Sequence, residues 1–120
     1  MNIIFHGEED QKIAEIVTED VVLSTTQDAL DLIVKPSLQG ARKIILHQEN
    51  IAPDFFVLRT GLAGDVLQKF VNYRIQLAIV GDFEHVESES LKAFIVECNR
   101  GRDVFFAADV PTAVQKLLSC

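Results

Sequence analysis

The stretch from residue 60 to residue 80 joins a helical pattern directly to a strand pattern. Apolar residues recur at helical spacing with polar residues opposite them, so we predict an amphipathic helix over residues 60–74. Its apolar stripe consists of Leu62, Val66, Leu67, Phe70 and Val71. A nearly continuous apolar run over residues 75–80 then ends at Gly81, which indicates a strand covered on both faces. A helix that leads into such a strand is the repeating unit of a parallel α/β fold.

Similar segments occur along the rest of the chain. We predict strands over residues 2–6, 12–18, 43–47 and 104–107, and helices that begin near Thr25, Ser88 and Asp109. The first two strands flank a Gly-containing turn and indicate an antiparallel hairpin, whereas the later strands alternate with helices. The predicted fold class is therefore α/β. We expect a single domain over residues 1–120, with a mostly parallel five-stranded sheet, an antiparallel N-terminal strand and four helices.

Local signals predict where the helices begin and end. Thr25 and Asp28 have the spacing of a capping box. Pro36 is expected to end or bend the first helix, because proline has no N–H and restricts the residue before it. Thr60 is expected to cap the second helix, and Gly101 to adopt the left-handed conformation after the third.

Composition narrows the class of protein. Of the 120 residues 48% are hydrophobic, and the net charge of −7 disfavours nucleic-acid and anionic-membrane binding. No N-terminal signal pattern and no membrane-length apolar run is present. Cys98 and Cys120 are far apart and form no metal or redox motif, so we expect free thiols and a cytoplasmic location.

Two glycines, Gly61 and Gly64, lie at the start of the second predicted helix. They match neither the dinucleotide fingerprint nor the phosphate-binding loop, since the required further glycines and the lysine are missing. We expect them instead to let the helix pack closely on the sheet. No cofactor is predicted.

Polar residues follow several predicted strands at their carboxyl ends, where parallel sheets bind ligands. His47, Glu49, Asp82 and His85 have side chains that suit a divalent metal or an acid–base pair. None of them has a recognised ligand spacing, so the simpler interpretation is that they solvate strand ends. Cys98 lies on an apolar helical stripe and is expected to be unreactive.

Aromatic residues gather near the same strand ends. Phe55, Phe56, Val57 and Phe83 could line a small apolar pocket. The alternative is that Phe55 and Phe56 anchor the long loop over residues 48–59 onto the core.

Several motifs stand in order along the chain, among them Asp54-Phe55-Phe56, Thr60-Gly61-Leu62-Ala63-Gly64, Leu77-Ala78-Ile79-Val80-Gly81-Asp82-Phe83 and Glu97-Cys98-Asn99. They resemble a bacterial family of domains of unknown function, number 4180 in that series. The resemblance covers nearly the whole chain. It implies no assigned activity.

The predicted order of elements is also similar, more loosely, to the STAS domains of anti-sigma-factor antagonists and to SpoIIAA-like proteins. Those antagonists carry a phosphorylatable Ser in an Asp-Ser-Ser-Gly-Leu motif at the start of the second helix. Here Leu58-Arg59-Thr60-Gly61-Leu62 occupies that place, so Thr60 matches the acceptor but the acidic residue and first Ser are replaced. The resemblance implies that Thr60 could be phosphorylated and paired with Arg59. The alternative is that Thr60 only caps the helix.

These observations leave three hypotheses. The first is a non-catalytic regulatory or protein-interaction domain that docks a partner protein through Arg59, Thr60 and Gly61. The second is a module that binds a small apolar, lipid-like ligand near Phe55, Phe56 and Phe83. The third is a metal-assisted enzyme at the strand-end edge that uses Asp82, His85, His47 or Glu49. The sequence is also compatible with a homodimer.

Overall fold

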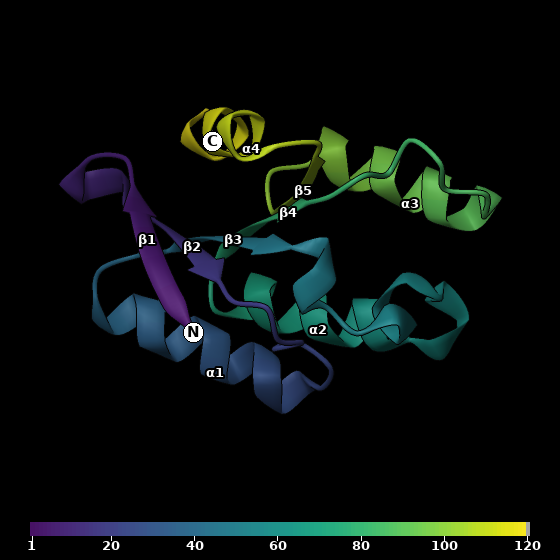
Figure 1. The fold of residues 1–120 in the computed structure, drawn as a ribbon, viewed down its shortest axis with the longest axis horizontal. Helices are drawn as coiled ribbons and strands as arrows, with labels where there is room; N and C mark the ends of the chain where they lie inside the picture. Colours follow the sequence, from purple (N-terminus) through teal and green to yellow (C-terminus); the bar gives the residue numbers. More distant parts are fainter. Residues whose placement is uncertain (120) are drawn as a thin grey trace.

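The computed structural model describes residues 1–119, and within them the chain forms one mixed sheet of five strands (Figure 1). The strands follow the order of the sequence across the sheet: β1 (Asn2–His6), β2 (Ile13–Val17), β3 (Lys43–His47), β4 (Gln76–Val80) and β5 (Val104–Ala107). β1 pairs antiparallel with β2, and every later pair is parallel. The predicted fold class is confirmed.

Four α-helices connect or follow the strands in the described part of the chain: α1 (Thr26–Leu38), α2 (Leu62–Asn72), α3 (Glu89–Arg100) and α4 (Val110–Leu118). α1 and α2 lie side by side below the sheet in Figure 1, and α4 lies above it. α3 flanks β5 and packs Phe94 against Phe106. Three predicted caps are confirmed, because the side chains of Thr25, Ser88 and Asp109 each accept a hydrogen bond from the helix that follows.

The core has two parts, one on each face of the sheet. The larger part lies between the sheet and α1, α2 and α3, and contains fully buried Phe55, Phe70 and Ile79. The smaller part lies under α4 and contains Ile13, Ile45 and Leu117. α4 packs against β3, β4 and β5. On the same face Ile4 of β1 is 48% exposed, so the β1 side of this face is open to solvent.

Two predicted helix ends are wrong. α1 continues past Pro36 to Leu38; Pro36 lies in the last turn, and its carbonyl accepts hydrogen bonds from the backbone N–H groups of Gln39 and Ala41. Gly40, at φ +87°, supplies the left-handed residue after this end. Gly101 has an extended backbone, with φ −88° and ψ −162°, and its N–H bonds to the carbonyl of Cys98.

The start of α2 also differs from the prediction. The helix begins at Leu62, and Gly61 is its N-cap residue in the left-handed conformation, at φ +78°. Thr60 instead ends a short 3₁₀ turn, Leu58–Thr60. The predicted close packing at Gly61 and Gly64 is absent, since a β-carbon at either position would meet no atom within 4 Å.

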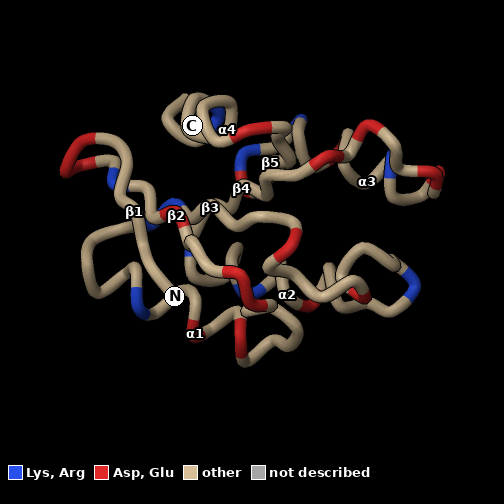
Figure 2. Tube along the Cα trace, in the orientation of Figure 1, with Lys and Arg blue, Asp and Glu red and all other residues tan. Residues whose placement is uncertain are grey.

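The basic residues in the described part of the chain do not form a single patch. Figure 2 shows Lys and Arg positions spread along the trace, as expected from the sequence. None of the helices in residues 1–119 has both the length and the apolar character that a membrane crossing needs. Cys98 is a free thiol, and the prediction for Cys120 lies outside the described residues.

Candidate functional site

The carboxyl ends of the parallel strands β2 to β5 meet at one edge of the sheet. Because the strand order never reverses, the sheet has no topological switch point, where α/β proteins usually open a ligand crevice. The candidate site is formed instead by the loops that follow β3 and β4. The loop after β3 folds into three short 3₁₀ turns, Gln48–Asn50, Pro53–Phe56 and Leu58–Thr60, before α2 begins.

Asn50 fixes the first of these turns. Its side chain is fully buried, and its Nδ2 donates to the carbonyls of Thr18, at 2.8 Å, and Asp20, at 3.0 Å. Its Oδ1 accepts from the backbone N–H of His47 at 3.3 Å. The amide therefore ties the loop after β2 to the loop after β3, and the sequence analysis missed it.

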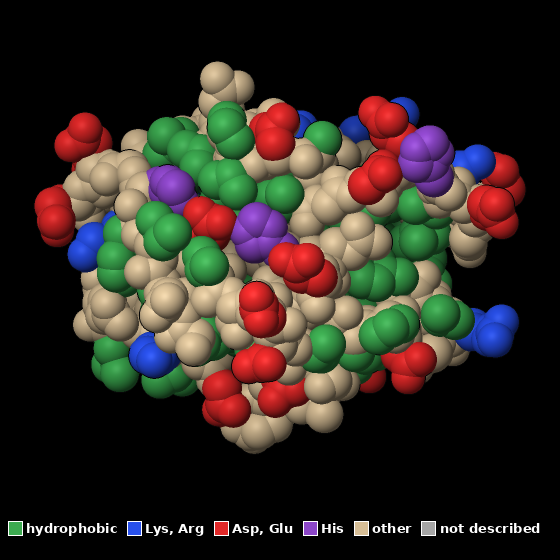
Figure 3. Space-filling view, viewed as in Figure 1, with side chains coloured by type: hydrophobic (Ala, Val, Ile, Leu, Met, Phe, Trp, Pro, Cys, Tyr) green, Lys and Arg blue, Asp and Glu red, His purple; other side chains and the backbone are tan. Residues whose placement is uncertain are grey.

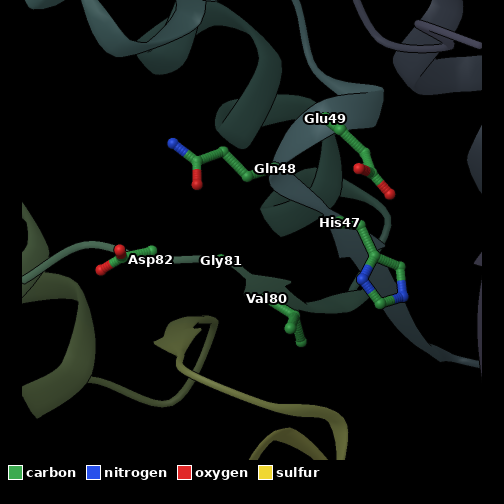
Figure 4. Close-up of a pocket in the computed structure, with 6 residues that line it drawn as sticks. All are labelled: His47, Gln48, Glu49, Val80, Gly81 and Asp82. Carbon is green, nitrogen blue, oxygen red and sulfur yellow. The ribbon is translucent and has the colours of Figure 1, made fainter.

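A polar hollow of about 380 Å³ lies between the ends of β3 and β4, and is lined by His47, Gln48, Glu49, Val80, Gly81 and Asp82. Figure 4 shows that His47 and Glu49 extend on one side of this site and Gln48 and Asp82 on the other. Gly81 is required here, because a β-carbon at that position would overlap the Gln48 side chain. Of the predicted donors, His47, Glu49 and Asp82 come together, whereas His85 does not line this hollow.

An apolar hollow of about 350 Å³ adjoins the polar one and shares Gln48 and Glu49 with it. Its other lining residues are Val21, Ile51, Pro53, Phe56, Phe83, Val86 and Leu91. The half-buried rings of Phe56 and Phe83 lie 6.1 Å apart between centroids. Each stacks edge-on against a buried ring, Phe56 on Phe55 and Phe83 on Phe106, both at 5.1 Å.

The aromatic prediction thus divides into two parts. Phe56 and Phe83 line the apolar hollow, as the pocket hypothesis requires. Phe55 is 1% exposed and belongs to the core, so it anchors the loop as the alternative proposed. Val57 is exposed but does not line the hollow.

Arg59, Thr60 and Gly61 are exposed at the far end of the same loop and line neither hollow. The Thr60 hydroxyl lies 2.9 Å from the carbonyl oxygen of Asp54 and 2.8 Å from that of Val57, so it can donate to either. It also accepts from the backbone N–H of Leu62 at 3.2 Å. Thr60 therefore holds the loop against the start of α2.

A cluster that the sequence analysis missed lies on the open part of the α4 face. The Glu15 carboxylate, in the middle of β2, bonds to His6 Nε2 at 2.9 Å and to His47 Nε2 at 2.7 Å. Figure 3 shows histidine side chains next to an acidic side chain, with apolar side chains nearby. Glu15 is 8% exposed, so its charge needs these partners.

The histidines change the acidity of this carboxyl. Burial acts to raise the pKa of Glu15, but the hydrogen bonds from His47 and His6, and their positive charge, outweigh burial and lower the pKa below its ordinary value of 4.5. One sequence signal could have found the cluster: Glu15 is a charged residue inside an otherwise apolar strand, and such a residue requires a partner on a neighbouring strand.

The structure does not bring the predicted metal ligands into one set. Within residues 1–119, Asp82, Glu84 and His85 are the one group of three whose ligand atoms all lie within 4.8 Å of one another. All three are exposed, and His85 Nε2 is 3.9 Å from Asp82 Oδ2. His47 is bonded to Glu15 instead. Burial, and then the charge of Glu97, raise the pKa of the Cys98 thiol, which disfavours its reactive thiolate form.

Comparison with known proteins identifies a family. No curated protein and no solved structure is significantly similar to the chain, so the likeness to STAS domains stays a prediction. The family described as Domain of unknown function (DUF4180) matches residues 8–117, which include every element of the sheet after β1. The chain is a member of the DUF4180 family.

Proposed function

We propose that the protein is a non-catalytic module that binds a small, mainly apolar molecule in the hollow between Phe56 and Phe83. The supporting observation is that these two half-buried rings line an open apolar hollow while their stacking partners are fully in the core. A volume of about 350 Å³ lies near the lower end of the range for ligand pockets, about 300–1,000 Å³. The hollow suits a ligand with one or two rings or a short acyl chain.

The adjoining polar hollow suggests what the ligand carries at its other end. Glu49 lies at the boundary between the two hollows, and Asp82 lines the polar one. Ionised carboxylates accept hydrogen bonds and cannot donate them. A hydroxyl, amide or ammonium group on the ligand would therefore be favoured over an anionic group.

The proposal is tested first by native mass spectrometry of freshly purified protein, which should show a small apolar molecule bound. A titration with N-phenyl-1-naphthylamine, a neutral apolar fluorophore with an N–H donor, tests the hollow itself. Val21→Asp places a charge in the hollow and should weaken binding about tenfold or more, because the carboxylate would lose solvation when the probe binds.

Val34→Asp is the matched control for this titration. Val34 lies on α1, away from the hollow, and is 53% exposed, compared with 52% for Val21. The control should bind the probe as the wild type does. Absence of probe binding in the wild type, or equal binding by both variants, would contradict the proposal.

A second candidate function is docking of a partner protein around Arg59. The Arg59 side chain is exposed and has no hydrogen bond or ion pair within residues 1–119, which favours an acidic partner. Control by phosphorylation of Thr60 would require its hydroxyl to leave the carbonyls of Asp54 and Val57. Incubation with kinases of the source cell and intact-mass measurement tests this control, and an unchanged mass would remove it.

A further inference from the structure

The two edge strands of the sheet, β1 and β5, differ in how far other elements cover them. At the β5 edge, the side chain of Asn99 on α3 accepts a hydrogen bond from the outward N–H of Phe106 at 2.8 Å. All four residues of β5 are buried. α3 therefore covers this edge.

The β1 edge is open. Apart from the pairing with β2, no backbone group of Asn2–His6 has a hydrogen-bond partner within residues 1–119. Ile4 and Phe5 are 48% and 39% exposed. The strand contains no Lys and no Pro, and its one-to-one register with β2 has no bulge, so it lacks three of the features that prevent edge-to-edge pairing.

We propose that β1 pairs antiparallel with β1 of a second copy of this chain, around a twofold axis at Ile4. With this centre all five residues of the strand are paired: Ile4 faces Ile4 of the second copy, Ile3 faces Phe5, and Asn2 faces His6. Apolar residues oppose apolar residues, and no acidic or basic side chain opposes one of like charge. In a chain with a net charge of −7, this neutral strand is a segment where two copies can approach without strong repulsion.

The pairing would also extend the cluster around Glu15. Ile4 lies opposite Glu15 in the sheet, and His6 lies on the same face as Ile4. Asn2 of the second copy would therefore stand beside His6, whose Nε2 bonds to Glu15. The open part of the α4 face would become continuous across both copies, with the two histidine–carboxylate clusters near the axis. This inference does not depend on the ligand proposed for the hollow.

The first experiment measures the mass in solution by analytical ultracentrifugation over a range of concentrations. The wild type should have the mass of two chains at high concentration. Ile4→Lys places two ammonium groups opposite each other and should give the mass of one chain. Val96→Lys on α3 is the control, because Val96 is also 48% exposed, and it should behave as the wild type does.

A second experiment keeps the inference testable even if Ile4→Lys does not fold. Directly opposed residues in antiparallel strands have α-carbons close enough for a disulfide, so mild oxidation of Ile4→Cys should give a covalent dimer. The control Val96→Cys also adds one thiol to the native cysteines, and it should not form a covalent dimer under the same oxidation. A monomeric wild type at all concentrations, a dimer that Ile4→Lys leaves intact, or no cross-linking of Ile4→Cys would each overturn the proposal.

Discussion

Nε2 of His47 lies 2.7 Å from Oε2 of Glu15, and the two residues belong to neighbouring parallel strands. The other carboxylate oxygen of Glu15 bonds to His6 on β1. One nearly buried charge therefore links three strands on the part of the sheet that α4 leaves open. His47 also lines the polar hollow, so this network connects the open face to the hollow that adjoins the proposed ligand site.

Replacement of Glu15 should make stability less dependent on pH. The pKa of Glu15 is lowered in the folded protein, so its contribution is present above the ordinary value of 4.5 and is lost as the pH falls through the lower folded value. Glu15→Gln should lower the free energy of unfolding by about 1–2 kcal/mol at neutral pH, because neutral hydrogen bonds replace charge-assisted ones. The difference should shrink below pH 4.5.

Denaturant unfolding at several pH values checks this expectation. Glu89→Gln is the control, since Glu89 forms only an exposed ion pair with Lys92 at 3.3 Å and should change stability by about 0.5 kcal/mol or less at any pH. A Glu15→Gln difference that stays constant as the pH falls would mean that ionisation of Glu15 does not stabilise the fold.

Asn50 should be a main stabilising residue of the candidate site. Asn50→Ala removes the fully buried amide that donates to the carbonyls of Thr18 and Asp20, so we expect the free energy of unfolding to fall by about 1–3 kcal/mol. Asn72→Ala on α2 is the control, because its amide bonds only to exposed Gln68 and the change should be within about 0.5 kcal/mol. Similar losses in the two variants, measured by denaturant unfolding, would contradict this role.

The sequence was sufficient for features that depend on neighbouring residues. Residues 43–47 and 104–107 form strands as predicted, because each is a short apolar run in a sheet covered there by helices. Ser88 and Asp109 cap helices as predicted, since a cap bonds to a backbone N–H three residues away. Pro36 and Gly101 did not follow local rules: α1 continues two residues past Pro36, and Gly101 is extended and not left-handed.

The site could be predicted only in part, because its contacts join residues far apart in sequence. His47, Glu49 and Asp82 line one hollow as expected, because each lies at or just after the carboxyl end of a parallel strand. Glu15 meets His47 only through the register of β2 with β3, which the sequence does not specify. Phe55 and Phe56 are adjacent and chemically identical, so only the fold of the loop decides which is buried and which lines the hollow.

Thr60 should stabilise the loop through its hydroxyl group. Thr60→Val keeps the shape of the side chain but removes its bonds to the carbonyls of Asp54 and Val57, so we expect a loss of about 1 kcal/mol in unfolding free energy. Thr60→Ser keeps the hydroxyl and should lose less. Denaturant unfolding distinguishes them, and equal stability of wild type and Thr60→Val would show that the hydroxyl bonds are not stabilising.

Replacement by alanine should lower the stability of the protein at Gly81 and raise it at Gly64. Gly81→Ala introduces a β-carbon that overlaps the Gln48 side chain, so we expect a loss of about 1–3 kcal/mol in unfolding free energy. Gly64→Ala should instead stabilise the protein by about 0.4–1 kcal/mol, because Gly64 lies in α2 with open space around it and alanine reduces the entropy of the unfolded chain.

A double-mutant cycle identifies the cause of the Gly81 effect. In a Gln48→Gly chain, Gly81→Ala should cost about 1 kcal/mol less than in the wild type, because the overlapping side chain is gone. The same cycle with Gly64→Ala should show no coupling. If Gly81→Ala costs the same with and without the Gln48 side chain, then contact between these two residues does not shape the polar hollow.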